Sequence, residues 1–232
     1  MSHVLALISP VTSTIQMDGQ MFSRANPSPR YLELIQLYRR LHREGELRLG
    51  LSGEQTYPGI SLLPHVHRIK RLIVSTGAKT ILDYGCGKGH QYDPVPIRIP
   101  DDRTWDSVID YWDVDEVCCY DPCYERYCKL PQGEFDGVIS TDVLEHCPEQ
   151  DVPWVVGEMF GYARKFVFAN VASYPALTTL PNGENAHCTV RPPDWWEAVF
   201  RRAGNSRAGV TWKLMVEQHD QDADAIKRPP GS

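Results

Sequence analysis

One acidic residue and three glycines stand at a spacing that could bind a small ligand. Asp83 lies two residues before Gly85, and Gly87 and Gly89 follow at alternate positions. The apolar pair 81–82 just before them predicts a buried strand that ends in a tight loop. Glycines let the backbone turn sharply and let a ligand lie directly against the main chain. Because ligands of open parallel sheets bind beyond the carboxyl ends of the strands, this loop is a candidate ligand site.

The same spacing bears on the charge of the ligand. The dinucleotide-binding turn has the form Gly-x-Gly-x-x-Gly, which differs from the Gly-x-Gly-x-Gly found here. An acid just before the turn, such as Asp83, repels a pyrophosphate and attracts a cation. The residues therefore favour a positively charged ligand over a dinucleotide.

Residues 80–89, Thr-Ile-Leu-Asp-Tyr-Gly-Cys-Gly-Lys-Gly, resemble the first motif of the class I S-adenosylmethionine-dependent methyltransferases. Residues 135–146, Phe-Asp-Gly-Val-Ile-Ser-Thr-Asp-Val-Leu-Glu-His, resemble the fourth strand of that family and the turn after it. The resemblance covers roughly residues 78–218. It implies an α/β, Rossmann-like fold with a mainly parallel, seven-stranded type of sheet flanked by helices, a final antiparallel strand, and S-adenosyl-L-methionine as the cofactor.

The resemblance also implies a set of cofactor-binding residues. They follow the first, second and fourth predicted strands: Asp83, Gly85, Cys86, Gly87, Asp121, Pro122, Thr141 and Asp142. Asp121 ends the strand predicted over 117–122, where a carboxylate can accept hydrogen bonds from both ribose hydroxyls. Asp121-Pro122-Cys123-Tyr124 also resembles the Asp-Pro-Pro-Tyr signature of amino-methyltransferases acting on DNA bases. In those enzymes the signature ends the fourth strand, which residues 135–140 match better, so we interpret Asp121 as the ribose acid.

Methyl transfer is an in-line displacement, in which placement of the acceptor supplies much of the rate. A general base helps when the acceptor carries a proton, and histidine suits neutral pH. We expect His146 and Glu145, after the fourth strand, and His187, in the long loop 172–192, to be catalytic. A structural role for the histidines stays open.

Aromatic residues and cysteines are candidates for binding a substrate or a metal. We expect Tyr57 and Trp195 to contact the substrate. Cys118, Cys119, Cys123 and Cys128 lack the paired spacing of structural zinc sites, so no metal is predicted.

The chain divides into four predicted parts. They are a flexible segment 1–29, a helical cover 30–77, the cofactor-binding domain 78–218 and a flexible tail 219–232. Helices are predicted over 30–44, 62–75, 105–111, 153–162 and 193–203, with strands over 80–83, 117–122, 129–131, 135–140, 165–171 and 209–218. Three prolines within 91–100 mark an insertion over 91–116, since they cannot continue a helix.

Composition also indicates the compartment in which the protein is expected. The chain has 232 residues, of which 42% are hydrophobic, and its seven cysteines favour reduced thiols and a cytoplasmic protein. Its opening lacks the basic residues of a secretory signal, and no apolar run predicts a membrane span.

Charge is spread unevenly. Residues 1–88 hold 11 basic and 6 acidic side chains, residues 89–150 hold 4 and 15, and residues 151–232 hold 9 of each. An acidic body disfavours nucleic acid, so we expect a small-molecule acceptor with a polar group to methylate. Two alternatives stay open: a nucleic-acid methyltransferase that uses the basic helices 30–48 and 62–75, and a non-catalytic S-adenosylmethionine-binding subunit. The oligomeric state is not predicted.

Overall fold

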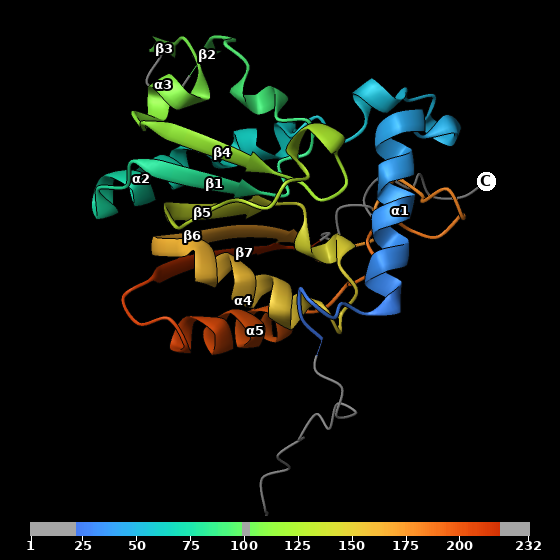
Figure 1. Ribbon diagram of the computed structural model, residues 1–232. Coiled ribbons are helices and arrows are strands. Elements are labelled where there is room, and N and C mark those ends of the chain that lie inside the picture. The colour runs from blue at the N-terminus through green and yellow to red at the C-terminus, as the bar shows by residue number, and fades with distance from the viewer. Residues whose placement is uncertain (1–21, 99–102, 219–232) are drawn as a thin grey trace, which may run out of the picture.

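A five-stranded parallel sheet forms the centre of the molecule (Figure 1). The computed structural model describes residues 22–98 and 103–218. The strands are β1 (Thr80–Tyr84), β4 (Glu116–Tyr120), β5 (Phe135–Thr141), β6 (Ala163–Ala172) and β7 (Thr211–Glu217), in the spatial order β4-β1-β5-β6-β7. All four neighbouring pairs are parallel. The predicted α/β class is confirmed.

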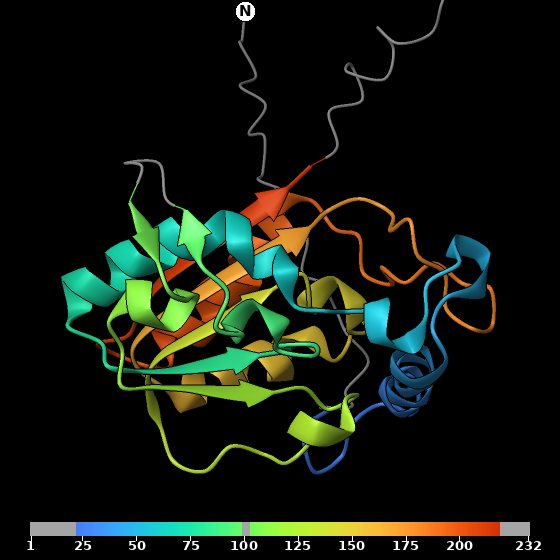
Figure 2. The same cartoon turned by 90° about the horizontal axis from the view of Figure 1, so that it is seen from above.

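Helices cover both faces of this sheet, as Figure 2 shows from above. On one face lie α2 (Val66–Thr76) and α3 (Val108–Trp112), and on the other lie α4 (Val152–Tyr162) and α5 (Pro193–Asn205). Phe166 and Phe168 point toward α2, while Val167 between them points toward α4 and α5. A strand buried on both faces must be apolar at successive positions, which explains the continuous apolar run in β6. Truncating either buried phenylalanine to alanine is expected to cost about 3–5 kcal/mol.

Helix α1 (Pro29–Glu44) stands beside the carboxyl ends of the strands (Figure 1). The Ser28 hydroxyl caps its start by accepting a hydrogen bond from the amide of Tyr31, and Gly45 ends it with φ +86°. A side chain at Gly45 would place its Cβ 2.1 Å from the carbonyl oxygen of Leu51. The apolar face of α1 packs on Leu180 and Ala186 of the long loop after β6. These contacts hold helix and loop together over the edge of the sheet.

The last strand differs from its prediction. β7 pairs with β6 in parallel, from Phe166 opposite Thr211 to Ala172 opposite Glu217, so the expected antiparallel final strand is wrong. The main sheet has five strands within the described residues, and no strand is present at 129–131, where the chain continues from a 3₁₀ turn at Glu125–Tyr127.

Two predicted helices also begin later than expected. Pro64 lies in a 3₁₀ turn over Ile60–His65, and α2 begins after it, because proline cannot donate the hydrogen bond of a continuing helix. In the insertion, β2 (Ile97–Arg98) pairs antiparallel with β3 (Thr104–Trp105), so Trp105 is in a strand and α3 starts at Val108.

The predicted flexible ends fall mostly outside the described residues, which begin at position 22 and end at position 218. In the described part of the first segment, Arg24 pairs with Glu158 of α4, and Ser28 donates its amide to the carboxylate of Asp151 at 3.0 Å.

Candidate functional site

A cavity of about 460 Å³ lies between the carboxyl edge of the sheet and α1. It is walled by residues after β1, β4 and β5 and covered by α1, the segment 51–61 and the loop residues 174–178 and 187. The chain places β4 on one side of β1 and β5 on the other, which makes this the topological switch point where open α/β sheets bind ligands. The volume is within the range of small-molecule sites.

The glycine loop after β1 forms one wall of the cavity. Gly85 donates its amide to the carbonyl of Tyr120 at 2.7 Å, which ties the loop to β4. Gly85 has φ +89°, and a Cβ there would lie 2.4 Å from Val143. Gly87 has φ +58°, and its Cβ would lie 2.2 Å from the carbonyl oxygen of Tyr57. Both positions therefore require glycine, and the bare backbone is left to form the wall.

Asp121 lies beside this loop, directly after β4, with only 8% of its surface exposed. Its carboxylate accepts hydrogen bonds from the amides of Gly87 at 3.0 Å and Cys123 at 2.8 Å. Burial raises the pKa of Asp121 to about 6, although these amide bonds oppose the shift. Asp121 and Pro122 both line the cavity. A carboxylate held in this way keeps lone pairs for the hydroxyls of a ligand.

Asp83, which was expected to bind the cofactor, lies behind the loop and does not line the cavity. Its Oδ2 accepts hydrogen bonds from Gln91 Nε2 and the Tyr92 hydroxyl, both at 2.8 Å. Burial raises its pKa to about 6. Cys86 is buried too, and it lies outside the set of lining residues. Both residues support the shape of the loop from behind.

The chain after β5 forms the next wall. Thr141 and Asp142 line the cavity, and Asp142 has φ +54°, an unusual backbone conformation for a residue other than glycine. Asn170 on β6 donates its Nδ2 to Asp142 Oδ1 at 3.1 Å. Strained residues of this kind cluster at functional sites because the surrounding contacts hold them there.

The segment 56–59 covers the glycine loop directly. The carbonyls of Tyr57 and Pro58 accept hydrogen bonds from the amides of Lys88 at 2.9 Å and His90 at 3.0 Å. Tyr57 has φ +47° and lines the cavity. Its hydroxyl is buried and has no hydrogen-bond partner within the described residues. A buried hydroxyl without a partner is a place where a ligand or an ordered water can supply the missing hydrogen bond.

Lys88, which the sequence did not single out, fixes this cover. Its buried Nζ donates to the carbonyl of Thr56 at 2.9 Å and lies 3.1 Å from Nδ1 of His42 on α1. The His42 ring stacks on Tyr124, with centroids 5.3 Å apart. Burial, helped by the charge of Lys88, lowers the pKa of His42 to about 3, so His42 accepts the bond as a neutral ring. One lysine of the glycine loop thus joins the loop to α1.

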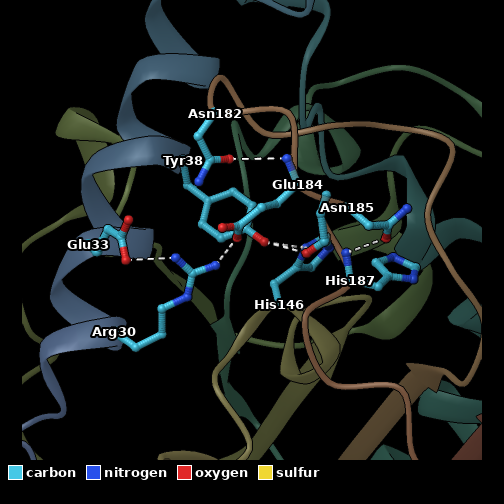
Figure 3. Close-up of polar contacts among 9 residues, drawn as sticks. Arg30, Glu33, Tyr38, His146, Asn182, Glu184, Asn185 and His187 are labelled. Carbon is cyan, nitrogen blue, oxygen red and sulfur yellow. Dashed lines mark hydrogen bonds and ion pairs between the residues drawn. The ribbon is translucent and has the colours of Figure 1, made fainter.

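His146 and His187 both line the cavity, and their rings lie 4.9 Å apart at 80° (Figure 3). Nδ1 of His146 is 3.0 Å from the carbonyl oxygen of Ala186, and Nδ1 of His187 is 2.6 Å from that of Tyr174. A carbonyl only accepts, so each Nδ1 carries the proton and each Nε2 keeps a free lone pair.

The basicity of the two rings is reduced. Burial lowers the pKa of His146 to about 3, and it lowers the pKa of His187 as well. Both are therefore neutral at pH 7. They are able to accept a hydrogen bond, and the low pKa makes His146 a weak proton acceptor.

Glu145 and Trp195, both predicted to act on the methyl acceptor, do not line the cavity. Glu145 is fully buried and accepts a hydrogen bond from the amide of Ala172 at 2.7 Å. Burial and nearby Asp142 raise its pKa to about 8. Trp195 lies on α5 with its ring 4.9 Å from Trp196, partly buried against the core. The placement of both residues argues against the predicted catalytic and substrate-binding roles, because neither lines the cavity.

The charges of the lining side chains have one sign. Asp121 and Asp142 are the carboxylates among the described lining residues, and these include no lysine or arginine. Three arginines around the cavity already bond to protein oxygens: Arg39 donates to the carbonyl of Pro122 at 3.2 Å, Arg30 pairs with Glu184, and Arg48 donates to the carbonyl of Leu177. The cavity is thus suited to a neutral or cationic ligand and not to a phosphate.

Comparison with known proteins found no match to this chain among family models, curated proteins or solved structures. Within the described residues, no group of three or more His, Cys, Asp or Glu side chains is arranged to hold a metal, and none of the helices could cross a membrane. The chemistry of the cavity is therefore the basis for inferring a function.

Proposed function

We propose that this protein binds S-adenosyl-L-methionine in the cavity and transfers its methyl group to a polar atom of a small-molecule acceptor. The observation that carries the proposal is the charge of the cavity at the switch point. Backbone glycines and two carboxylates line it, without a lysine or arginine among the described lining residues. S-adenosyl-L-methionine suits such a site because its sulfonium and ammonium outweigh its single carboxylate, whereas a nucleotide phosphate would meet no lysine or arginine among the described lining residues.

The residues of the chain fit this cofactor at several points. The glycine loop would lie against it, Asp121 would accept from the ribose hydroxyls, and Asp142 would contribute negative charge toward the ammonium. The unsatisfied hydroxyl of Tyr57 supports a further polar contact. On this proposal the sheet is a shortened Rossmann-like version of the family's sheet, with the parallel β7 as its last described strand.

The cofactor supplies a methyl carbon already activated by the sulfonium, so the chain's own task is placement. The neutral histidines offer Nε2 lone pairs that can orient an O–H or N–H donor. Since His146 is weakly basic, we infer that orientation contributes more than proton removal before attack.

Nucleic acid is a weaker candidate as acceptor. The basic side chains of α1 are largely paired within the protein, as Arg40 is with Glu44 and Arg30 with Glu33 and Glu184. A non-catalytic binding subunit remains the alternative that the experiment must separate.

Calorimetry on the full chain tests the proposal. We expect S-adenosylmethionine and S-adenosylhomocysteine to bind one per chain, while ATP and NAD bind at least 100-fold more weakly. Tighter binding of ATP or NAD would overturn the proposal. If both adenosyl ligands bind, labelled S-adenosylmethionine offered with a metabolite extract distinguishes an enzyme from a binding subunit by transfer of the label.

A further inference from the structure

We infer that the methyl acceptor is an uncharged molecule with an apolar body and one hydroxyl or amine, whose polar end is oriented by His146 and His187 and whose body leaves the cavity past Leu177. This inference rests on the proposed function and adds the class of substrate. It is carried by the charge, the histidine tautomers and the apolar mouth of the same cavity.

Charge excludes acidic acceptors. A carboxylate or phosphate entering the cavity would meet Asp121 and Asp142 without a compensating lysine or arginine among the described lining residues. Arg30, Arg39 and Arg48 already donate to Glu184 and to the carbonyls of Pro122 and Leu177. The buried Lys88 is likewise engaged, by the carbonyl of Thr56. Because a buried unpaired charge is very costly, an anion should bind far more weakly than a neutral molecule of the same shape.

The two histidines specify a hydrogen-bond donor. Their Nδ1 protons are held by backbone carbonyls of Ala186 and Tyr174, so only the Nε2 lone pairs are left for a ligand. Tyr38 fixes the first of these arrangements, since its hydroxyl donates to the same Ala186 carbonyl at 2.5 Å and lies 2.9 Å from His146 Nδ1 (Figure 3). A neutral hydroxyl or amine can donate to such a nitrogen, and a carboxylate cannot.

The outer end of the cavity is apolar and open to solvent. Leu177 and Ile60 both line it, although 87% and 56% of their surfaces are exposed. Leu34 and Ile35 of α1 add to the apolar lining. An exposed leucine that also lines a cavity is explained by an apolar ligand that extends across it, because burying the leucine against that ligand is favourable.

The test uses the full chain saturated with S-adenosylhomocysteine and three probes: 4-butylphenol, 4-butylbenzoate and phenol. Calorimetry should give at least tenfold tighter binding of 4-butylphenol than of 4-butylbenzoate. The affinity for 4-butylphenol should also be at least tenfold higher than the affinity for phenol, since each buried methylene raises the affinity about fourfold.

Two variants connect the probes to named residues. His146→Phe keeps an aromatic ring but removes both nitrogens, Nε2 and the Nδ1 that contacts Ala186 and Tyr38. 4-Butylphenol should then bind about tenfold more weakly while S-adenosylhomocysteine affinity is kept. Leu177→Ser should weaken 4-butylphenol severalfold and leave phenol unchanged. Leu47→Ser is the matched control, because Leu47 is 90% exposed and does not line the cavity.

The outcomes separate the two proposals. Failure of S-adenosylhomocysteine to bind overturns the proposed function and this inference with it. Normal binding of S-adenosylhomocysteine, combined with equal or tighter binding of 4-butylbenzoate or no binding of any probe, overturns only the class of acceptor.

Discussion

The two halves of the cavity are held in different ways. The half on the sheet is built from residues at strand ends, where backbone amides fix the carboxylate of Asp121. The half under α1 is held by side chains from distant parts of the chain, as in the bond between Tyr38 and Ala186, which are 148 residues apart. The sheet half is thus set by local sequence, and the cover half depends on tertiary packing.

The largest effect on ligand affinity is expected from a substitution at Gly87, in the sheet half of the cavity. Gly87→Ala forces a side chain into positive φ and against the Tyr57 carbonyl, 2.2 Å from the new Cβ. S-adenosylhomocysteine affinity measured by calorimetry should fall at least 100-fold, because both loop and cover must shift. Gly133→Ala is the matched control, since Gly133 also has positive φ (+79°) but its Cβ would meet nothing within 4 Å. Equal losses in both variants would mean that backbone strain alone, and not contact with the cover, is responsible.

The next largest effect on ligand affinity is expected from protonation of Asp121. Its pKa is raised to about 6 by burial, so the carboxylate is ionised above pH 7 and gains a proton as the pH falls through 6. If the ionised form accepts from the ribose, affinity for S-adenosylhomocysteine should be constant above pH 7 and fall up to tenfold per unit below pH 6. At pH 7.5 Asp121→Asn should bind about 10- to 100-fold more weakly, the loss of charge-assisted hydrogen bonds.

The same variant identifies the titrating group. Asp121→Asn should bind with little dependence on pH between 5 and 8. A slope that persists in this variant would point to another buried carboxyl, such as Asp83 or Asp142, whose pKa values are also raised by burial.

Local sequence predicted the sheet half well. Apolar runs followed by Asp121 and by Thr141-Asp142 placed those residues at strand ends, where they line the cavity. It could not show that Asp83 lies behind the loop, because its partners Gln91 and Tyr92 lie in an insertion without a recognisable pattern. The antiparallel last strand was expected from family resemblance, and nothing in the residues of β7 itself specifies its direction.

The cover half was predicted only as two helices and a loop. Amphipathic spacing located α1, but spacing does not reveal which loop a helix packs against. Lys88 appears in the sequence as an ordinary loop lysine, and its burial follows from Thr56 and His42 meeting it in space. The low pKa of His146 likewise comes from burial by residues far away in the chain.

A moderate effect is expected from releasing the cover at Lys88. Lys88→Met leaves the Thr56 carbonyl and His42 Nδ1 without their donor, at a cost of about 1–3 kcal/mol in the free energy of unfolding. S-adenosylhomocysteine affinity should fall about threefold to tenfold, because part of the binding energy must reorder the cover. Lys79→Met is the control, since Lys79 is exposed at the far end of β1 and pairs with Asp113. Urea unfolding and calorimetry measure both quantities, and an unchanged affinity in a destabilised Lys88→Met would show that the cover does not contact the ligand.

The smallest effect on affinity is expected from a substitution at Trp195, and a substitution at Tyr57 is its counterpart. Both aromatics were predicted to contact substrate, but only Tyr57 lines the cavity, whereas Trp195 packs on Trp196 and the core beneath α5. Trp195→Phe should therefore change S-adenosylhomocysteine affinity less than twofold. Tyr57→Phe removes one buried hydroxyl that has no partner within the described residues, so its loss matters only if a ligand satisfies it. A neutral hydrogen bond corresponds to about a twofold to tenfold loss. Calorimetry on both variants distinguishes the two positions, and equal affinities would mean that the Tyr57 hydroxyl stays unpaired in the complex.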